Sequence, residues 1–267
     1  MNMKVDLCGV TLNNPVMTAS GTFGSGAEYA EFVDLNKLGA VVTKGVANVP
    51  WPGNPTPRVA EVYGGMLNAV GLQNPGIDLF VERDIPFLKQ FDTKIMVNVC
   101  GHSTEEYIEV VERLSDQPVD LLEISCPNVK EGGIAFGQDP KAVEAITKEM
   151  KKHAAQPVIM KLSPNVTDIT EMARAAEAGG ADGLSLIYTI TGMKIDINRQ
   201  KFVLANKTGG MSGPAIHPVA VRMVYQTAQA VRLPIVGMGG IMNAEDAIEM
   251  ILAGATAVSV GTANFTN

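Results

Sequence analysis

Residues 158–187, VIMKLSPNVTDITEMARAAEAGGADGLSLI, contain one complete strand–helix–strand unit. Val158 to Lys161 and Gly183 to Ile187 are short, nearly continuous apolar runs, which are typical of strands buried on both faces of a parallel sheet. Between them, Asp168 to Gly179 has the apolar spacing of a helix and ends in glycine shortly before the second strand. The stretch therefore predicts a βαβ unit, the repeating element of α/β folds.

The same alternation runs through the whole chain. Further short apolar runs predict strands at residues 16–19, 40–43, 95–99, 121–125, 235–238 and 257–260. Further helical patterns lie at residues 104–114, 140–153, 217–231 and 244–254. Because no break in composition separates these units, the sequence predicts a single (β/α)8 TIM barrel domain over residues 1–267.

Two stretches of sequence are additional to the strands and helices that a (β/α)8 barrel needs. Residues 46–65 are rich in proline and glycine and predict an ordered excursion over the top of the barrel. Residues 191–213 contain an alternating polar run, which predicts a hairpin followed by a loop, and both stretches are suitable lids. No helical pattern follows residues 257–260, so we expect either a truncated chain or a barrel that is open at its seam.

Composition narrows the class of protein. The chain has 267 residues, 46% hydrophobic and 18% charged, which is typical of a globular enzyme. A net charge of -7 without a basic cluster argues against nucleic acid as a partner, and no window approaches the ~20 apolar residues of a membrane span. The three cysteines are widely spaced and no signal peptide is evident, so we expect a cytoplasmic protein. No histidine lies at ligand spacing from an acidic residue, so we expect no metal site.

Function in a barrel lies where the strands end, and the predicted strand ends here are rich in glycine, lysine and amides. The late glycines, Gly237-Met-Gly-Gly240 and Gly261-Thr262, predict a phosphate-binding cradle, although tight turns alone would also need glycine. Lys44 and Lys161 end buried strands, where a lysine must form an ion pair or face an anionic ligand. Cys126, in a Ser-Cys-Pro-Asn turn, is either a base or nucleophile or an inert buried thiol.

A set of motifs in a fixed order gives a family resemblance. They are Thr43-Lys44-Gly45, Asn68-Ala-Val-Gly71-Leu-Gln-Asn74, Ser125-Cys-Pro-Asn128, Lys161-Leu-Ser-Pro-Asn165, Thr208-Gly-Gly-Met-Ser-Gly213, Gly237-Met-Gly-Gly240 and Gly261-Thr-Ala-Asn-Phe265. Nearly end to end, the sequence resembles the catalytic subunit of class 1B dihydroorotate dehydrogenase. Asn128-Val-Lys-Glu-Gly-Gly and Ala135-Phe-Gly favour class 1B over class 1A. The resemblance implies an FMN barrel that oxidises (S)-dihydroorotate to orotate in de novo pyrimidine biosynthesis.

The resemblance also implies residue roles. Cys126 would be the base that removes the C5 proton while C6 passes hydride to the flavin. The implied substrate-binding residues are Lys44, Asn68, Gly71, Leu72, Asn128 and Thr189. The implied FMN contacts are Ala19, Ser20, Lys44, Asn98, Lys161, Ile187, Gly213, Gly239, Gly240, Gly261 and Thr262. It further implies a homodimer and a partner subunit that carries FAD and a 2Fe-2S cluster and passes electrons to NAD.

Three departures from the family pattern affect these expectations. The family reads Glu-Ile-Asn-Ile-Ser-Cys-Pro-Asn where this chain reads Glu123-Ile-Ser-Cys126. Either Glu123 fills the slot of an asparagine that meets flavin and substrate, or an Asn-Ile pair has been lost, which we favour. A loss of two residues keeps the facing of the strand but shortens its reach by about 6–7 Å. Tyr188 replaces a small amide before Thr189, and the absent last helix is expected to expose the eighth strand. An FMN barrel with altered substrate or impaired turnover is therefore the alternative function.

Overall fold

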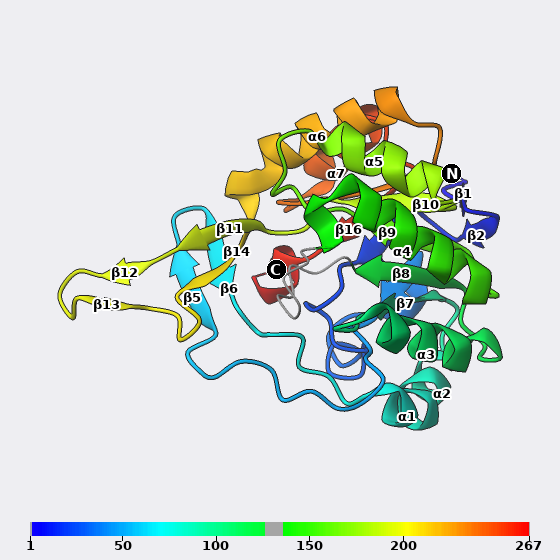
Figure 1. Ribbon diagram of the computed structural model, residues 1–267, viewed down its shortest axis with the longest axis horizontal. Coiled ribbons are helices and arrows are strands. Elements are labelled where there is room, and N and C mark those ends of the chain that lie inside the picture. The colour runs from blue at the N-terminus through cyan, green and yellow to red at the C-terminus, as the bar shows by residue number, and fades with distance from the viewer. Residues whose placement is uncertain (1, 126–135, 267) are drawn as a thin grey trace.

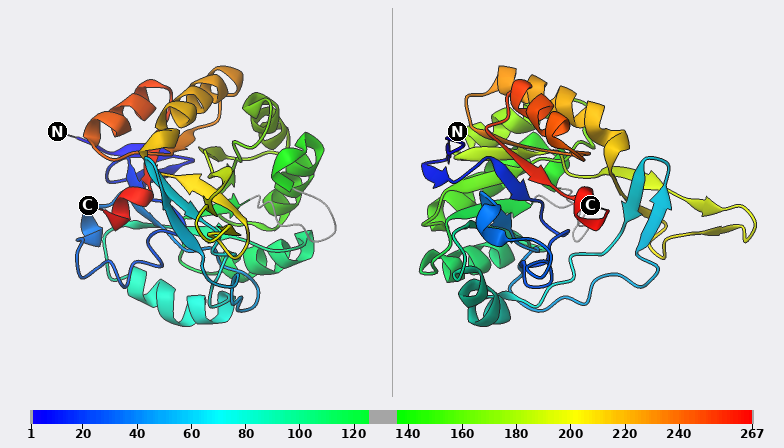
Figure 2. Two further views of the ribbon diagram at one scale, coloured as in Figure 1. Left: turned by 90° about the vertical axis from the view of Figure 1, so that its left-hand side faces the viewer. Right: turned by 180° about the vertical axis from the view of Figure 1, so that it is seen from behind.

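The computed structural model describes residues 2–125 and 136–266. Its centre is a closed barrel of parallel strands in which neighbours along the chain pair with each other, and the last strand pairs with the first (Figures 1 and 2). All the predicted strands are present, which confirms the predicted (β/α)8 barrel. The barrel strands are β3 (Val16–Thr18), β4 (Ala40–Val42), β7 (Lys94–Val99), β8 (Leu121–Ser125), β9 (Val158–Lys161), β10 (Gly183–Leu186), β15 (Ile235–Met238) and β16 (Ala257–Val260).

Helices cover the outside of the barrel, and local sequence fixes where they begin. Side chains of Ser103, Asp139, Asp168 and Asn243 each accept a hydrogen bond from an N–H group in the first turn that follows. The long helices are α3 (Thr104–Ser115), α4 (Pro140–His153), α5 (Ile169–Ala178), α6 (His217–Ala230) and α7 (Ala244–Leu252). Shorter elements are η1 (Leu35–Lys37), α1 (Ile77–Leu79), η2 (Phe80–Asp84), α2 (Ile85–Leu88), η3 (Phe136–Gln138), η4 (Pro214–Ile216) and η5 (Thr262–Phe265). In the part of the chain that is described, no helix combines the length and apolarity that crossing a membrane requires.

The amino-terminal end of the barrel is filled by apolar side chains. The hairpin of β1 (Val5–Leu7) and β2 (Val10–Leu12) contributes Leu7 and Leu12, which cluster with inward-facing residues of the barrel strands. These side chains are fully buried, and the larger cluster of apolar residues lies between the barrel and its helices. The amino-terminal end of the barrel is thus closed, and polar groups gather at the carboxyl ends of the strands.

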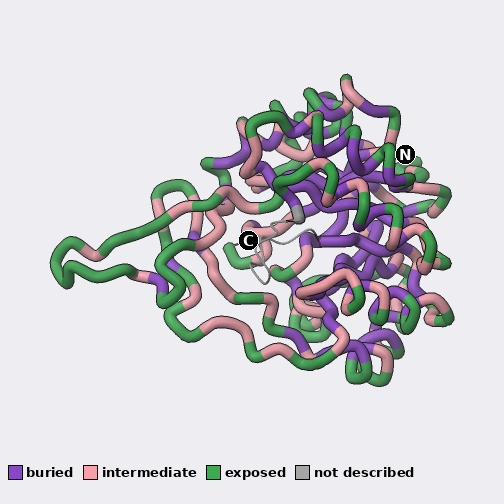
Figure 3. The backbone as a smooth tube through the Cα atoms, viewed as in Figure 1, coloured by how far each residue is buried: buried purple, intermediate pink, exposed green. Residues whose placement is uncertain are grey.

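The two predicted excursions join in one antiparallel sheet beyond the carboxyl ends of the barrel strands (Figure 1). The sheet has the order β11 (Ile190–Met193), β14 (Thr208–Ser212), β6 (Gly65–Asn68) and β5 (Val59–Val62). The prediction of a hairpin followed by a loop was therefore incomplete, because residues 208–212 form a strand that pairs with β6. Strands β12 (Ile195–Asp196) and β13 (Lys201–Phe202) extend from this sheet as an arm that is mostly exposed (Figure 3).

The seam of the barrel is closed. Strand β16 pairs with β15 on one side and with β3 on the other, so the expected alternative of a barrel open at its seam was wrong. The expectation that the eighth strand is exposed was also wrong, because Ala257, Val258 and Ser259 are buried. On the neighbouring helix α7, Ile248, Ile251 and Leu252 are exposed.

Candidate active site at the carboxyl end of the barrel

Lys44 follows β4 and carries a half-buried ammonium group at the mouth of the barrel. Its N–H group donates to the Gly24 carbonyl, and its Nζ atom lies 3.8 Å from where a Cβ atom of Gly21 would be. Within residues 2–125 and 136–266, no carboxylate lies within ion-pairing distance of this ammonium. Burial lowers the pKa of Lys44 below its ordinary value. A desolvated cation without a counter-ion favours an anionic ligand.

Lys161 ends β9 and has a different environment, because it forms an ion pair with Glu123. Its Nζ atom lies 3.3 Å from Oε2 of Glu123, and both side chains are almost completely buried. Asn98 donates to the same carboxylate oxygen at 2.6 Å, and Ser185 donates to the other oxygen at 2.7 Å. Of the two alternatives open for each lysine, Lys161 therefore shows the ion pair and Lys44 does not.

The glycine-rich turns after the last strands lie against one another. A Cβ atom on Gly240 would lie 2.8 Å from the Gly213 carbonyl oxygen, and the Thr262 hydroxyl donates to the Ser212 hydroxyl at 2.8 Å. Gly239 and Gly240 both have positive φ angles, +128° and +70°, which favour glycine. Among the described residues, the N–H groups of Gly240, Gly261 and Thr262 have no hydrogen-bond partner in the protein. This arrangement fits a phosphate group, which accepts hydrogen bonds from such N–H groups.

The remaining predicted cofactor contacts border these turns. The Ala19 N–H group donates to the Val260 carbonyl at 2.7 Å, which places residues 19 and 20 beside Gly261. The Ile187 N–H group donates to the Met238 carbonyl at 2.9 Å, next to Gly239. The structure therefore brings the predicted positions Ala19, Ser20, Lys44, Asn98, Lys161, Ile187, Gly213, Gly239, Gly240, Gly261 and Thr262 to one end of the barrel.

The predicted substrate residues come from the excursions. Asn68 donates to the Gly210 carbonyl at 3.3 Å, and the Thr189 side chain lies directly against Gly210, so both residues meet on β14. Leu72, after Gly71, has a φ angle of +54°, and its Cδ2 atom lies 3.6 Å from where a Cβ atom of Gly45 would be. The segment from Asn68 to Leu72 thus runs from the sheet to the residue that follows Lys44.

Tyr188, the residue that departs from the family's small amide, lies close to Lys161. The centre of its ring is 5.6 Å from the Lys161 Nζ atom. The residue is 38% exposed, and desolvation is the main cause that raises the pKa of its hydroxyl group. Lys161 on β9 therefore lies between the Glu123 carboxylate on β8 and the Tyr188 ring, which follows β10, and both partners attract a cation.

Two predicted residues, Cys126 and Asn128, lie outside the described residues. The strand before them is held firmly, because the Tyr107 hydroxyl donates to the Ser125 carbonyl and Ser125 itself is buried. The other two cysteines, Cys8 and Cys100, are described by the structure. Cys100 is fully buried, and burial raises the pKa of both Cys8 and Cys100 to about 12, so neither thiol is a good nucleophile near neutral pH.

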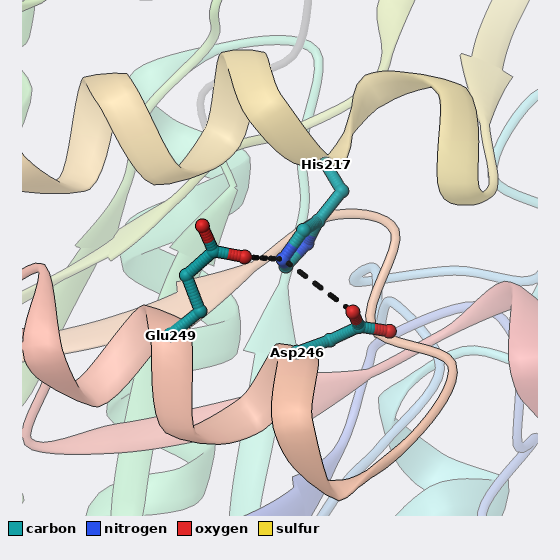
Figure 4. A group of neighbouring side chains, drawn as sticks. All are labelled: His217, Asp246 and Glu249. Carbon is teal, nitrogen blue, oxygen red and sulfur yellow. Dashed lines mark hydrogen bonds and ion pairs between the residues drawn. The ribbon is translucent and has the colours of Figure 1, made fainter.

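His217 forms a cluster that the sequence did not reveal (Figure 4). Its Nε2 atom lies 3.1 Å from Glu249 and 3.9 Å from Asp246, both on α7, whereas its Nδ1 atom lies 2.8 Å from the Gly239 carbonyl oxygen. The expectation concerned spacing along the sequence, whereas the fold brings ligand atoms of His217, Asp246 and Glu249 within 4.8 Å of one another; the absence of a metal site stays a prediction. His217 begins α6 and both acidic residues lie on α7, so no local motif marks the cluster. The cluster joins α6 and α7 to the turn at Gly239.

Comparison with known proteins decides the family. The sequence matches the family model described as dihydroorotate dehydrogenase over residues 2–267. The chain belongs to the dihydroorotate dehydrogenase family. A relative from Lachnoclostridium phytofermentans, named dihydroorotate dehydrogenase B (NAD(+)), catalytic subunit, is 75% identical over all of this chain and 90% of its own length. A relative of the same name from Alkaliphilus metalliredigens is 68% identical over all of this chain and 89% of its own length.

These dihydroorotate dehydrogenase relatives confirm the class 1B resemblance. The alignment with the first covers 269 positions against 267 residues here, so at least two of its positions have no counterpart in this chain, as a two-residue loss requires. The fold also resembles the dihydroorotate dehydrogenase of Eimeria tenella in complex with ferulenol. That structure has a TM-score of 0.82 and 21% identity, with 99% of this chain and 80% of the other covered, and it supports the fold alone.

Proposed function

We propose that this chain is a flavin-dependent dihydroorotate dehydrogenase, which oxidises (S)-dihydroorotate to orotate in pyrimidine biosynthesis. The observation that carries the proposal is the desolvated ammonium of Lys44, which has no counter-ion among the described residues and lies at the mouth of the barrel. A carboxylate substrate supplies the missing negative charge. The family and the names of the relatives support the same reaction.

The cofactor of this proposal is FMN, which accepts a hydride when it is bound. Gly213, Gly239, Gly240, Gly261 and Thr262 hold its phosphate through N–H groups, since the free amides of the last two turns point to such a ligand. The ring contacts the residues at the other strand ends, namely Ala19, Ser20, Lys44, Asn98, Lys161 and Ile187.

In this proposal the substrate lies between the mouth of the barrel and the sheet above it. Lys44 binds its carboxylate, and Asn68, Gly71, Leu72 and Thr189 orient its ring, together with Asn128. Cys126 removes the C5 proton. A cysteine's ordinary pKa of about 8.5 leaves some thiolate near neutral pH, which can take a carbon-bound proton.

The electrons leave through a partner. The relatives carry NAD(+) in their names and are called catalytic subunits, which supports a separate electron-transfer subunit. We propose, as the class 1B resemblance implies, that this subunit carries FAD and a 2Fe-2S cluster. Such a cluster is usually held by four cysteines, and this chain has only three. The catalytic chain is proposed to form a homodimer and to work in the cytoplasm.

An anaerobic flavin titration tests the proposal. The protein is loaded with FMN, freed of excess, and mixed with L-dihydroorotate while the visible flavin band is followed. Rapid bleaching is expected, since hydride transfer reduces the ring. A persistent yellow spectrum would contradict dihydroorotate oxidation, and loss of FMN on desalting would contradict the cofactor site.

A further inference from the structure

The buried carboxylate of Glu123 has no role in the function proposed above. We propose that Glu123 is a positioning residue that fixes Lys161 and Asn98 at the flavin ring and neutralises the charge of Lys161, so that the chain binds reduced flavin less tightly than an unpaired lysine would allow. This inference rests on the proposed FMN site and extends it to the redox balance of the cofactor.

The geometry places Glu123 at the centre of four neighbouring strands. Glu123 on β8 lies directly opposite Asn98 on β7, and Lys161 on β9 is paired in register with Ser185 on β10. The carboxylate accepts hydrogen bonds from Asn98 and Ser185 and forms the ion pair with Lys161. All four side chains are buried, with relative exposures of 4% or less, so none can turn away into solvent.

This network determines where the two predicted ring contacts point. Asn98 donates its side-chain N–H to Glu123 at 2.6 Å, which leaves its amide oxygen as the free acceptor. The Lys161 ammonium forms the ion pair with Glu123, and the centre of the Tyr188 ring lies 5.6 Å from the same nitrogen. Without the carboxylate, both side chains would lose the partner that selects their orientation.

The charge consequence follows from the same contacts. Reduction adds negative charge to a flavin ring, and a neighbouring ammonium stabilises that charge. A buried carboxylate 3.3 Å from the ammonium cancels much of this effect, because screening by water is weak inside the barrel. Of the two lysines at the mouth of the barrel, Lys44 therefore presents its positive charge to a ligand and Lys161 does not.

The first part of the test uses the apoprotein. Urea unfolding is measured for the wild type, Glu123→Gln, Lys161→Met and the double variant. Each single variant leaves a buried charge unpaired, whereas the double variant removes both charges. We expect the two changes to be non-additive by at least about tenfold in the unfolding equilibrium constant. Additive effects would overturn the coupling between Glu123 and Lys161.

The second part measures the FMN-loaded protein without substrate. The midpoint potential of bound FMN is determined against a reference dye for the wild type, Glu123→Gln, Glu123→Asp and the exposed control Glu31→Gln. Glu123→Gln should raise the ratio of reduced-flavin to oxidised-flavin affinity about tenfold, which is about 30 mV for a two-electron couple. Glu123→Asp keeps the negative charge, so its midpoint potential should stay close to that of the wild type. The midpoint potential of the control Glu31→Gln should equal that of the wild type.

The outcomes separate this inference from the proposed function. If the wild type binds no FMN, the proposed function fails and the inference falls with it. If the wild type binds FMN and Glu123→Gln leaves the potential unchanged, the proposed function stands and the inference is overturned. A potential that shifts equally in Glu31→Gln would also overturn it, because the effect would then be one of overall charge.

Discussion

Gly240 offers a direct test of the proposed phosphate cradle. Its φ angle is +70°, and a Cβ atom there would lie 2.8 Å from the Gly213 carbonyl oxygen and 2.9 Å from the His217 amide nitrogen. Both neighbours are backbone atoms, so they cannot move aside as the end of a flexible side chain would. Gly240→Ala must therefore displace either the turn itself or the start of α6.

The magnitude follows from two contributions. A non-glycine residue in the left-handed region costs about 1–2 kcal/mol, and overpacking a close contact costs a further 1–3 kcal/mol or so. Gly240→Ala should thus lower the free energy of unfolding by about 2–5 kcal/mol. Gly180→Ala is the matched control, since its φ angle is +88° and the nearest atom to the new Cβ is the Lys151 Cγ atom at 3.9 Å. The free energy of unfolding of Gly180→Ala should fall only by the left-handed backbone cost of about 1–2 kcal/mol.

Two measurements check the prediction. Urea unfolding of the apoprotein, followed by circular dichroism, gives the loss of stability for each variant. Quenching of FMN fluorescence gives the dissociation constant, which should rise at least about tenfold for Gly240→Ala and remain unchanged for Gly180→Ala. Equal losses of stability would refute the close-contact argument, and unchanged FMN affinity in a folded Gly240→Ala protein would refute the cradle.

The remaining predictions concern the substrate side of the mouth. Lys44→Met should weaken orotate binding by about 10-fold to 100-fold, the value of a hydrogen bond to a charged group, and a titration that follows the flavin spectrum measures it. Because burial lowers the pKa of Lys44 below 10.5, wild-type orotate affinity should start to fall at a lower pH than for an exposed lysine. Between the pKa of Lys44 in the folded protein and its higher pKa in the unfolded chain, the unfolded state binds more protons, so the free energy of unfolding should rise with pH. A pH series of orotate titrations checks the affinity, and a pH series of urea unfolding checks the stability. Tyr188→Asn should lower the KM for dihydroorotate if the ring obstructs the pocket, and an unchanged KM would contradict that reasoning. Iodoacetamide near neutral pH should label Cys126 in the native protein but not Cys8 or Cys100, whose pKa values burial raises to about 12; peptide mass analysis would reveal any exception.

The barrel was predictable because each strand is a buried apolar run, and because the long helices have helical spacing and, except for α6, a side-chain cap. Asp168 and Asn243, for example, cap the helices that follow them through local hydrogen bonds. The sheet above the mouth was only partly predictable. Its strands β6 and β14 lie about 140 residues apart, as the 142-residue separation of Asn68 and Gly210 illustrates, and short glycine-rich strands carry little periodic signal.

The His217 cluster shows the same limit for side chains. Asp246 and Glu249 share one face of α7, which the sequence reveals, but their partner stands at the start of another helix. What brings them together is the packing of α6 against α7 around the turn at Gly239. Contacts of this kind depend on the barrel being closed, so they follow from the fold and not from any single segment.

Glu123 gives the clearest case of a question that sequence leaves open. Side chains on a strand alternate with a period of two, so a loss of two residues keeps the same set facing the barrel interior. The carboxylate therefore faces inward whether it replaces an asparagine or precedes a deletion, and the motif alone does not identify its partners. The register opposite Asn98 and the contact with Lys161 supply that information. Since Lys161 is then paired, attraction of an anionic substrate to this mouth comes from Lys44, and Lys44→Met should reduce orotate binding more than the double variant of Glu123→Gln and Lys161→Met, which removes both charges of the pair.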